Sequence, residues 1–391
     1  MAQTKIKSEH STSTVGVAEE RLPIDPSLKQ LLRDKILDAC ACFESSIATQ
    51  DKNYLRNLHV FAKQQSKNFD PSSLLKLFEK HRNSFKNGSE IDPNKISPSL
   101  HFVENNNDSE LFKLVRNMWS MPYNKGYGRR LRFIVYDDYH EGVIGIIGLQ
   151  SPPADLTSRD SLFSYPKGKK LDLVNSTMDA YTIGAIPPYS NILGGKLCAG
   201  LIATDAIRQA YWRKYASKKT WMDGKAIAQP LVAVTTTGAF GRSSMYNRVR
   251  YKDRLLAEPI GYTRGFGTLH LEHLYDDICD FLKMSENYKM GGFGNGPKVR
   301  WQNIANALQA LNLSAQLLNH GVQREVFLFR FVNNLESGMA GGDFGNPISL
   351  SVDDYSLFWK ERWACPRAAR YPNWKSQDDR EKLKSTLIRL T

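Results

Sequence analysis

The chain carries near its middle the stretch Asp179-Ala-Tyr-Thr-Ile-Gly-Ala-Ile-Pro-Pro-Tyr-Ser-Asn-Ile-Leu-Gly-Gly-Lys196. Its first half predicts a buried strand over residues 181–186. Pro187 and Pro188 end that strand because neither residue can donate a ladder hydrogen bond. The Gly-Gly-Lys that follows predicts the entry of a long helix over residues 197–215.

This helix entry has two interpretations. Gly194 and Gly195 let the backbone approach a ligand closely, and the free N–H groups of a first helical turn, the helix dipole and Lys196 all favour an anion there. The first interpretation is therefore a phosphate or cofactor site. The second is structural, because a glycine pair also allows a helix to pack closely on a sheet.

Composition favours a polyanionic partner, nucleic acid above all. The 391 residues are 41% hydrophobic, enough for two or three domains, and carry a net charge of +13. Between Asp205 and Arg254 there are eleven Arg and Lys residues against three Asp. A basic protein without a nucleic-acid partner is the alternative, and the clustering favours binding.

Cysteine usage and hydropathy predict a cytoplasmic protein. The five cysteines show no paired Cys-x-x-Cys spacing, which fits reduced thiols better than disulfides or structural zinc. The N-terminus lacks an apolar signal core, and no run of residues is long enough to span a bilayer. We therefore expect no membrane partner.

Four segments are predicted along the chain: a disordered polar tail over residues 1–22, a helical domain over 23–89, an α+β domain over 90–280 and a C-terminal helical and extended region over 281–391. In the helical domain, Asp70 and Pro71 predict a helix start. In the C-terminal region, the glycine-rich residues 291–296 predict a connector. Residues 324–332 of the same region predict a strand with alternate phenylalanines on one face. Trp359, Trp363 and Trp374 could stack on unpaired bases or close a small core.

The element order in the central segment resembles the GNAT acyltransferase fold. Strands are predicted over residues 100–103, 130–135, 143–149, 181–186, 231–235, 250–257 and 265–271, with helices over 108–119, 197–215 and 243–248. We therefore predict the fold class α+β, with a mixed GNAT-like central sheet, an N-terminal helical domain and a C-terminal α/β extension.

The GNAT resemblance implies a cofactor and an acid. The pyrophosphate of acyl coenzyme A, or a nucleotide-like phosphate ligand, would lie at the start of the helix that follows the fourth strand. The corresponding residues are Ser190, Asn191, Gly194, Gly195 and Lys196. Tyr246 stands where family members often have a general acid, and a tyrosine packed between helix and sheet is the alternative.

A metal site is not expected. His270, Glu272 and His273 form a compact group, but on a strand His273 would point away from the other two. The scattered carboxylates, Asp179 among them, define no set of ligands by their spacing.

Several separated blocks resemble the DruA family of Druantia anti-phage defence proteins over residues ~90 to ~365. They run in order from residues 119–122 and 126–133 through Arg159-Asp160 to residues 320–326 and Asn333-Asn334. The resemblance implies a component of a multi-protein bacterial defence system that acts beside a large helicase-like protein and other subunits.

Three functions stay open at this point. The first is a DNA-facing subunit with phosphate contacts from Arg129, Arg130, Arg132, Arg242, Arg248 and Arg250. The second is a GNAT-like enzyme that transfers an acyl or related group to a base, nucleotide or protein amine. The third is a non-enzymatic scaffold whose N-terminal helices recruit partner subunits.

Overall fold

The computed structural model describes residues 25–48, 52–64, 69–121, 126–220, 224–239, 241, 243–290 and 297–388. The tail predicted over 1–22 and the connector predicted over 291–296 lie outside these residues. Arg242 lies outside them as well.

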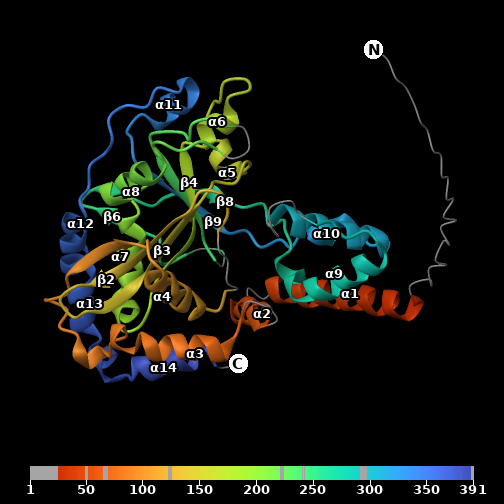
Figure 1. Ribbon diagram of the computed structural model, residues 1–391, viewed down its shortest axis with the longest axis horizontal. Helices are drawn as coiled ribbons and strands as arrows, with labels where there is room; N and C mark the ends of the chain where they lie inside the picture. Colours follow the sequence, from red (N-terminus) through yellow and green to blue (C-terminus); the bar gives the residue numbers. More distant parts are fainter. Residues whose placement is uncertain are drawn as a thin grey trace, which may run out of the picture.

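A seven-stranded mixed sheet forms the centre of the molecule (Figure 1). Its order is β1 (Pro98–Phe102), β2 (Leu131–Asp137), β3 (Gly142–Gln150), β4 (Thr177–Ala185), β5 (Ala233–Thr237), β9 (Glu325–Arg330) and β8 (Glu258–Tyr262). Only the β4–β5 pair is parallel among the strand pairs described. The predicted α+β class with a mixed central sheet is thus confirmed.

The strand predicted over residues 181–186 is confirmed as the second half of β4. The apolar run of β3 beside it is buried at every residue, and cis-linked Pro187 and Pro188 follow β4 almost at once. The strand predicted over 324–332 is also confirmed as β9, with Phe327, Phe329 and Phe331 all in the main core. Its neighbours are β5 and β8, so residues far along the chain complete the central sheet.

Helices cover both faces of the sheet. On one face lie α7 (Gly194–Leu201), α8 (Asp205–Tyr215) and α12 (Val352–Trp359), whose apolar residues share the main core with the strands. On the other lie α3 (Pro71–Lys80), α4 (Asn106–Asn117) and α14 (Asp379–Ser385), with a second core. Both layers can be followed in Figure 1.

A helical lobe stands to one side of the sheet (Figure 1). Leu32 and Ile36 of α1 (Pro26–Ala48) pack against α9 (Tyr275–Met284) and α10 (Pro297–Ala310) in a core of their own. The short helix η4 (Leu269–Leu274) contacts α1 and also α2 (Lys52–Gln64). The domain boundaries near residues 89 and 280 stay predictions, and this packing crosses both positions.

Local predictions have mixed outcomes. The Asp70 carboxylate caps α3 by accepting from the N–H groups of Ser72 and Ser73, as predicted. The strand predicted over residues 265–271 is wrong, because residues 269–274 form η4. The helix predicted over 243–248 is a series of turns, and the helix predicted over 197–215 breaks between α7 and α8.

The remaining elements are short. The extended stretch predicted over residues 250–257 is a small hairpin of β6 (Arg250–Tyr251) and β7 (Arg254–Leu255). The other short helices are η1 (Arg82–Ser84), η2 (Gly88–Glu90), α5 (Thr157–Asp160), α6 (Lys170–Val174), η3 (Tyr189–Ile192), η5 (Ala315–Leu318), α11 (Leu335–Gly341), η6 (Lys360–Ala364), α13 (Cys365–Arg370) and η7 (Pro372–Ser376). Trp359 and Trp374 are buried and Trp363 packs against the same core, which agrees with their closing a core rather than stacking on bases.

Candidate functional site

The start of α7 is covered by the C-terminal helices. Trp359 of α12 donates through its indole Nε1 to the carbonyl of Leu193 at 3.0 Å, and the Tyr355 hydroxyl donates to the carbonyl of Lys196 at 2.9 Å. Gly194 is buried, while Ser190, Asn191, Gly195 and Lys196 are half-buried. The geometry gives this glycine pair a packing role, and its use as a phosphate site stays a prediction.

Lys196 is bound to a neighbouring turn. Its ammonium donates to the carbonyl oxygens of Asn247 at 2.6 Å and of Ser244 at 3.3 Å. Burial lowers the pKa of Lys196, and the charge of Arg248 lowers it further. The ammonium therefore stabilises the turn over residues 243–248.

Tyr246 is buried in this turn, on the α7 side of the sheet. Its ring packs against Phe327 with 5.0 Å between centroids, and burial raises the pKa of its hydroxyl. Thr236 is its hydrogen-bond partner. These contacts match the structural alternative for Tyr246, and a role as general acid stays a prediction.

The predicted arginines divide into two groups. Arg129, Arg130 and Arg132 lie at the start of β2 beside α8, and two lysines join them. We call this group the β2 basic edge: Arg129, Arg130, Arg132, Lys214 and Lys218. Arg248 and Arg250 lie elsewhere, in the turn beside α7 and in β6.

Lys214 lies at the centre of the β2 basic edge. It donates to the carbonyl of Arg130 at 2.8 Å. Burial lowers the pKa of Lys214, and the charges of Arg132, Lys218 and Arg130 lower it further, while Glu104 opposes them. Like charges close enough to affect one another's protonation form a concentrated positive surface.

A polar recess that sequence analysis did not detect lies on the face of the sheet opposite α7. The Asp179 carboxylate accepts from Gln150 Nε2 at 3.1 Å and from Thr235 Oγ1 at 3.0 Å. The register of β3 and β4 shifts at Tyr181, so that the Tyr181 and Thr182 side chains both lie over Gly148. Asp179 and Tyr181 share this face because they are alternate residues of a strand, and the bulge brings Thr182 to the same face.

Four further side chains influence this recess, and we call the five together the Arg324 cluster: Tyr127, Arg159, Asp179, Glu272 and Arg324. Burial raises the pKa of Asp179, and the charges of Arg159 and Arg324 oppose the rise. Burial also raises the pKa of Glu272 and lowers that of Arg324. Asp179, Glu272 and Arg324 nevertheless keep some exposed surface, which places them in a recess rather than in a closed core.

Tyr127 and Arg159 border the recess in different ways. Burial raises the pKa of the Tyr127 hydroxyl to about 12, and the charge of Asp179 contributes. Arg159 is fully buried and donates to the carbonyls of Pro153 and Ala154, and its guanidinium pairs with Asp160. Arg159 therefore fixes a loop, whereas the charge of Arg324 acts on Asp179 and Glu272. Strongly perturbed pKa values in an enclosed site mark a functional candidate.

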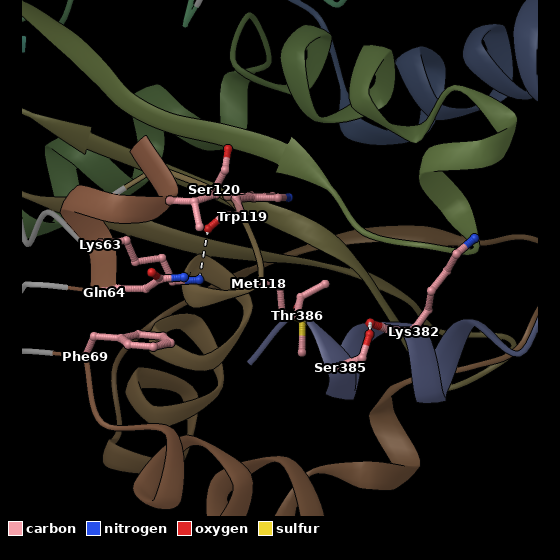
Figure 2. Close-up of a pocket in the computed structure, with 10 residues that line it drawn as sticks. Lys63, Gln64, Phe69, Met118, Trp119, Ser120, Lys382, Ser385 and Thr386 are labelled. Carbon is pink, nitrogen blue, oxygen red and sulfur yellow. Dashed lines mark hydrogen bonds between the residues drawn. The ribbon is translucent and has the colours of Figure 1, made fainter. Parts of the chain in front are cut away.

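A separate hollow lies between α2, the end of α4 and α14 (Figure 2). It has a volume of about 350 Å³ and is lined in part by Lys63, Trp119 and Lys382. Lys63 donates to the carbonyls of Asn117 at 2.5 Å and Trp119 at 3.2 Å, the latter drawn in Figure 2. Burial lowers the pKa of Lys63 to about 8. The Lys63 ammonium therefore binds carbonyl groups at the C-terminal end of α4 and is not free for a ligand.

Membrane-spanning helices and metal sites are both absent from the described ranges. None of their helices combines the length and apolar character that a bilayer crossing needs. Within the same ranges, no three His, Cys, Asp or Glu side chains are arranged to hold a metal ion. His270 and His273 lie on η4 rather than on the strand expected for them, and the Nε2 atom of His270 lies 2.8 Å from the carbonyl oxygen of Leu317.

Comparison with known proteins identifies the family. The family described as Druantia protein DruA matches residues 49–341 of the chain. Druantia protein DruA of Escherichia coli strain UMEA 4076-1 is 33% identical over 347 residues, which cover 84% of this chain and 83% of the relative. The chain belongs to the DruA family. It is therefore a component of the Druantia anti-phage defence system.

The DruA match spans every strand of the central sheet. The blocks that suggested the DruA family include Tyr127, Arg159 and Arg324, and the fold brings all three to one recess beside Asp179. No solved structure matches the chain, so its likeness to the GNAT fold stays a prediction.

Proposed function

We propose that this DruA-family chain is a nucleic-acid-facing subunit of the Druantia system and that the β2 basic edge contacts the phosphate backbone. The main support is the concentration of charge around Lys214, whose pKa is lowered by burial and lowered further by three neighbouring cations. The net charge of +13 points in the same direction. Other Druantia subunits, including a helicase-like protein, would act beside it on the same nucleic acid.

The cations of the β2 basic edge differ in how free they are to contact phosphate groups. The Arg129 guanidinium donates to the carbonyl of Asn175 at 2.7 Å and to the Tyr211 hydroxyl. Arg132 lies over the Phe112 ring and donates to Ser109. Arg130 and Lys218 are exposed. These two should therefore make the phosphate contacts, while the others raise the local potential.

The experiment is a binding titration with a labelled DNA strand and its duplex at several salt concentrations. Removing two phosphate contacts with Arg130→Gln and Lys218→Gln should weaken binding about tenfold or more at low salt. The matched control removes two exposed lysines elsewhere, Lys76→Gln and Lys169→Gln. Equal losses in both double variants would show that general charge, not this edge, governs binding.

A further inference from the structure

Arg324 is influenced by the charges of Asp179 and Glu272, but its Nε atom makes no hydrogen bond with them. Its backbone is fixed by Thr263, whose N–H donates to the Arg324 carbonyl at 2.9 Å and whose hydroxyl accepts from the Arg324 N–H at 3.0 Å. Within the described ranges the buried Nε of Arg324 has no hydrogen-bond partner. A buried N–H donor without an acceptor costs free energy, which a ligand acceptor would recover.

The carboxylates of Asp179 and Glu272 near Arg324 can accept further hydrogen bonds. Each oxygen of Asp179 accepts one hydrogen bond from protein, whereas a carboxylate can accept about four in all. Glu272 lies 3.7 Å from Arg300. Because the recess holds charges of both signs, it is unsuited to a polyphosphate. It fits a ligand with adjacent donors and acceptors.

Aromatic side chains occur both in this recess and on the segments that adjoin it. Within it, Tyr127 borders Asp179, and Tyr181 lies on the same face of β4. Outside it, Phe266 and Trp301 are 53% and 41% exposed, and their ring centroids are 6.5 Å apart. Exposed paired rings are what unpaired bases stack on.

The exposed pair is joined to the recess through the backbone. Gly321 donates its N–H to the carbonyl of Gly265 at 2.9 Å, which holds the segment carrying Phe266 beside the segment carrying Arg324. A Cβ at Gly265, where φ is +68°, would lie 2.8 Å from the Gly321 carbonyl carbon. Trp301 directly follows Arg300, the partner of Glu272. Both rings are thus anchored to residues that border the cluster.

Resting on the nucleic-acid role proposed above, we propose that the Arg324 cluster receives the polar edge of one unpaired base while Phe266 and Trp301 stack on neighbouring bases of the same strand. Arg324 donates to a ring nitrogen or carbonyl of the base, and Asp179 accepts from an amino or imino N–H. No bond is made or broken in this step. An extruded or single-stranded base is read in this way, by its edge and by stacking.

The test compares an intact DNA strand of about 12 nucleotides with an abasic strand of the same length. Both strands present the same phosphates, so the ratio of their affinities reports contacts to bases alone. The chain as it exists should bind the intact strand at least about tenfold more tightly, since one stacked base contributes ~1–3 kcal/mol. The Arg130→Gln, Lys218→Gln variant should lose affinity for both strands and keep this ratio.

Two variants test the site itself. Phe266→Ala with Trp301→Ala should reduce the ratio several-fold without endangering the fold, because both side chains are about half exposed and belong to no hydrophobic core. Arg324→Gln should reduce it as well. The matched control is Tyr139→Ala, an exposed tyrosine beside Lys95 at the β2–β3 turn, which should leave the ratio unchanged.

The outcomes separate the two proposals. Tight binding with an intact-to-abasic ratio near one would overturn the base site and leave the phosphate contacts standing. An intact-to-abasic affinity ratio that is the same in the Phe266→Ala, Trp301→Ala variant as in the unaltered chain would also overturn the base site. Absence of binding to any strand at low salt would overturn both. Displacement of the strand by free nucleotides at comparable concentration would show that the recess serves a small molecule instead.

Discussion

Thr235 on β5 lies directly opposite Asp179 on the parallel strand β4, and its hydroxyl donates to the Asp179 carboxylate at 3.0 Å. Gln150, opposite Asp179 on β3, donates to the other carboxylate oxygen at 3.1 Å. Three neighbouring strands therefore hold one acid in place. A carboxylate oriented by its own sheet is available to a ligand without further ordering.

Replacing Asp179 by Asn should change how stability depends on pH. Burial raises the pKa of Asp179, so just above pH 3.8 the folded protein binds more protons than the unfolded chain, and this contribution to stability is lost as the pH rises through the raised pKa. Asp179→Asn cannot ionise, and Gln150, whose Oε1 lacks a partner among the described residues, can rotate its amide to suit it. We expect the stability of the variant relative to the unaltered chain to increase as the pH rises above the ordinary aspartate value of 3.8. Urea unfolding at about pH 4 and about pH 8 measures this, and an equal difference at each pH would contradict it.

His320 should make the fold sensitive to acid. Burial and neighbouring charges lower the pKa of His320 from 6.5 to about 4, and its Nδ1 accepts from the N–H of Val322 at 3.1 Å. The unfolded chain therefore binds the proton first on acidification, and the free energy of unfolding should fall by about 2 kcal/mol from pH 7 to pH 5. His320→Asn keeps an acceptor and cannot be protonated in this range. Unfolding titrations should show a shallower loss in this variant, and an unchanged slope would count against the assignment.

The two glycines at the start of α7 should tolerate substitution unequally. A Cβ on Gly194 would lie 2.8 Å from the Tyr189 carbonyl oxygen, which belongs to the backbone and cannot easily move. A Cβ on Gly195 would lie 3.2 Å from the sulfur of Met245, a flexible side chain. Gly194→Ala should destabilise the protein by about 2 kcal/mol. Gly195→Ala serves as the matched control and should be nearly neutral in thermal unfolding, and similar effects of the two would show that close packing is not the reason for Gly194.

The β2 basic edge should be visible in the salt dependence of binding. Each phosphate contact contributes about one to the slope of log affinity against log salt concentration. Removing Arg130 and Lys218 together should therefore reduce the slope for duplex DNA by about two. Titrations across a range of KCl concentrations measure this slope. An unchanged slope with weaker binding would mean that the two residues act on the fold and not on phosphates.

Local patterns predicted the sheet better than they predicted the recess. Apolar runs and the Pro187-Pro188 pair were enough to place β3 and the end of β4, because these features act on their own segment. The strand expected at residues 265–271 failed since Gly265 and Gly267 take φ values of +68° and +154°, which turn the chain instead of extending it. Periodicity alone does not report such angles.

The recess required knowledge of the strand order. Asp179 and Arg324 are far apart in the chain, and they act on each other because β9 pairs with β5. The β4 bulge at Tyr181 also shifts which residues share a face. Neither the pairing nor the bulge has a pattern in the sequence that we could have used, whereas the separated family blocks did contain Tyr127, Arg159 and Arg324.

The late position of β9 has a consequence for the synthesis of this protein. Six of the seven strands leave the ribosome before residue 325, yet β5 and β8 must wait for β9 to join them. A chain that stops between residues 263 and 324 would expose two bare strand edges, which invite association with other chains. Incomplete translation should therefore give aggregated material rather than a folded protein.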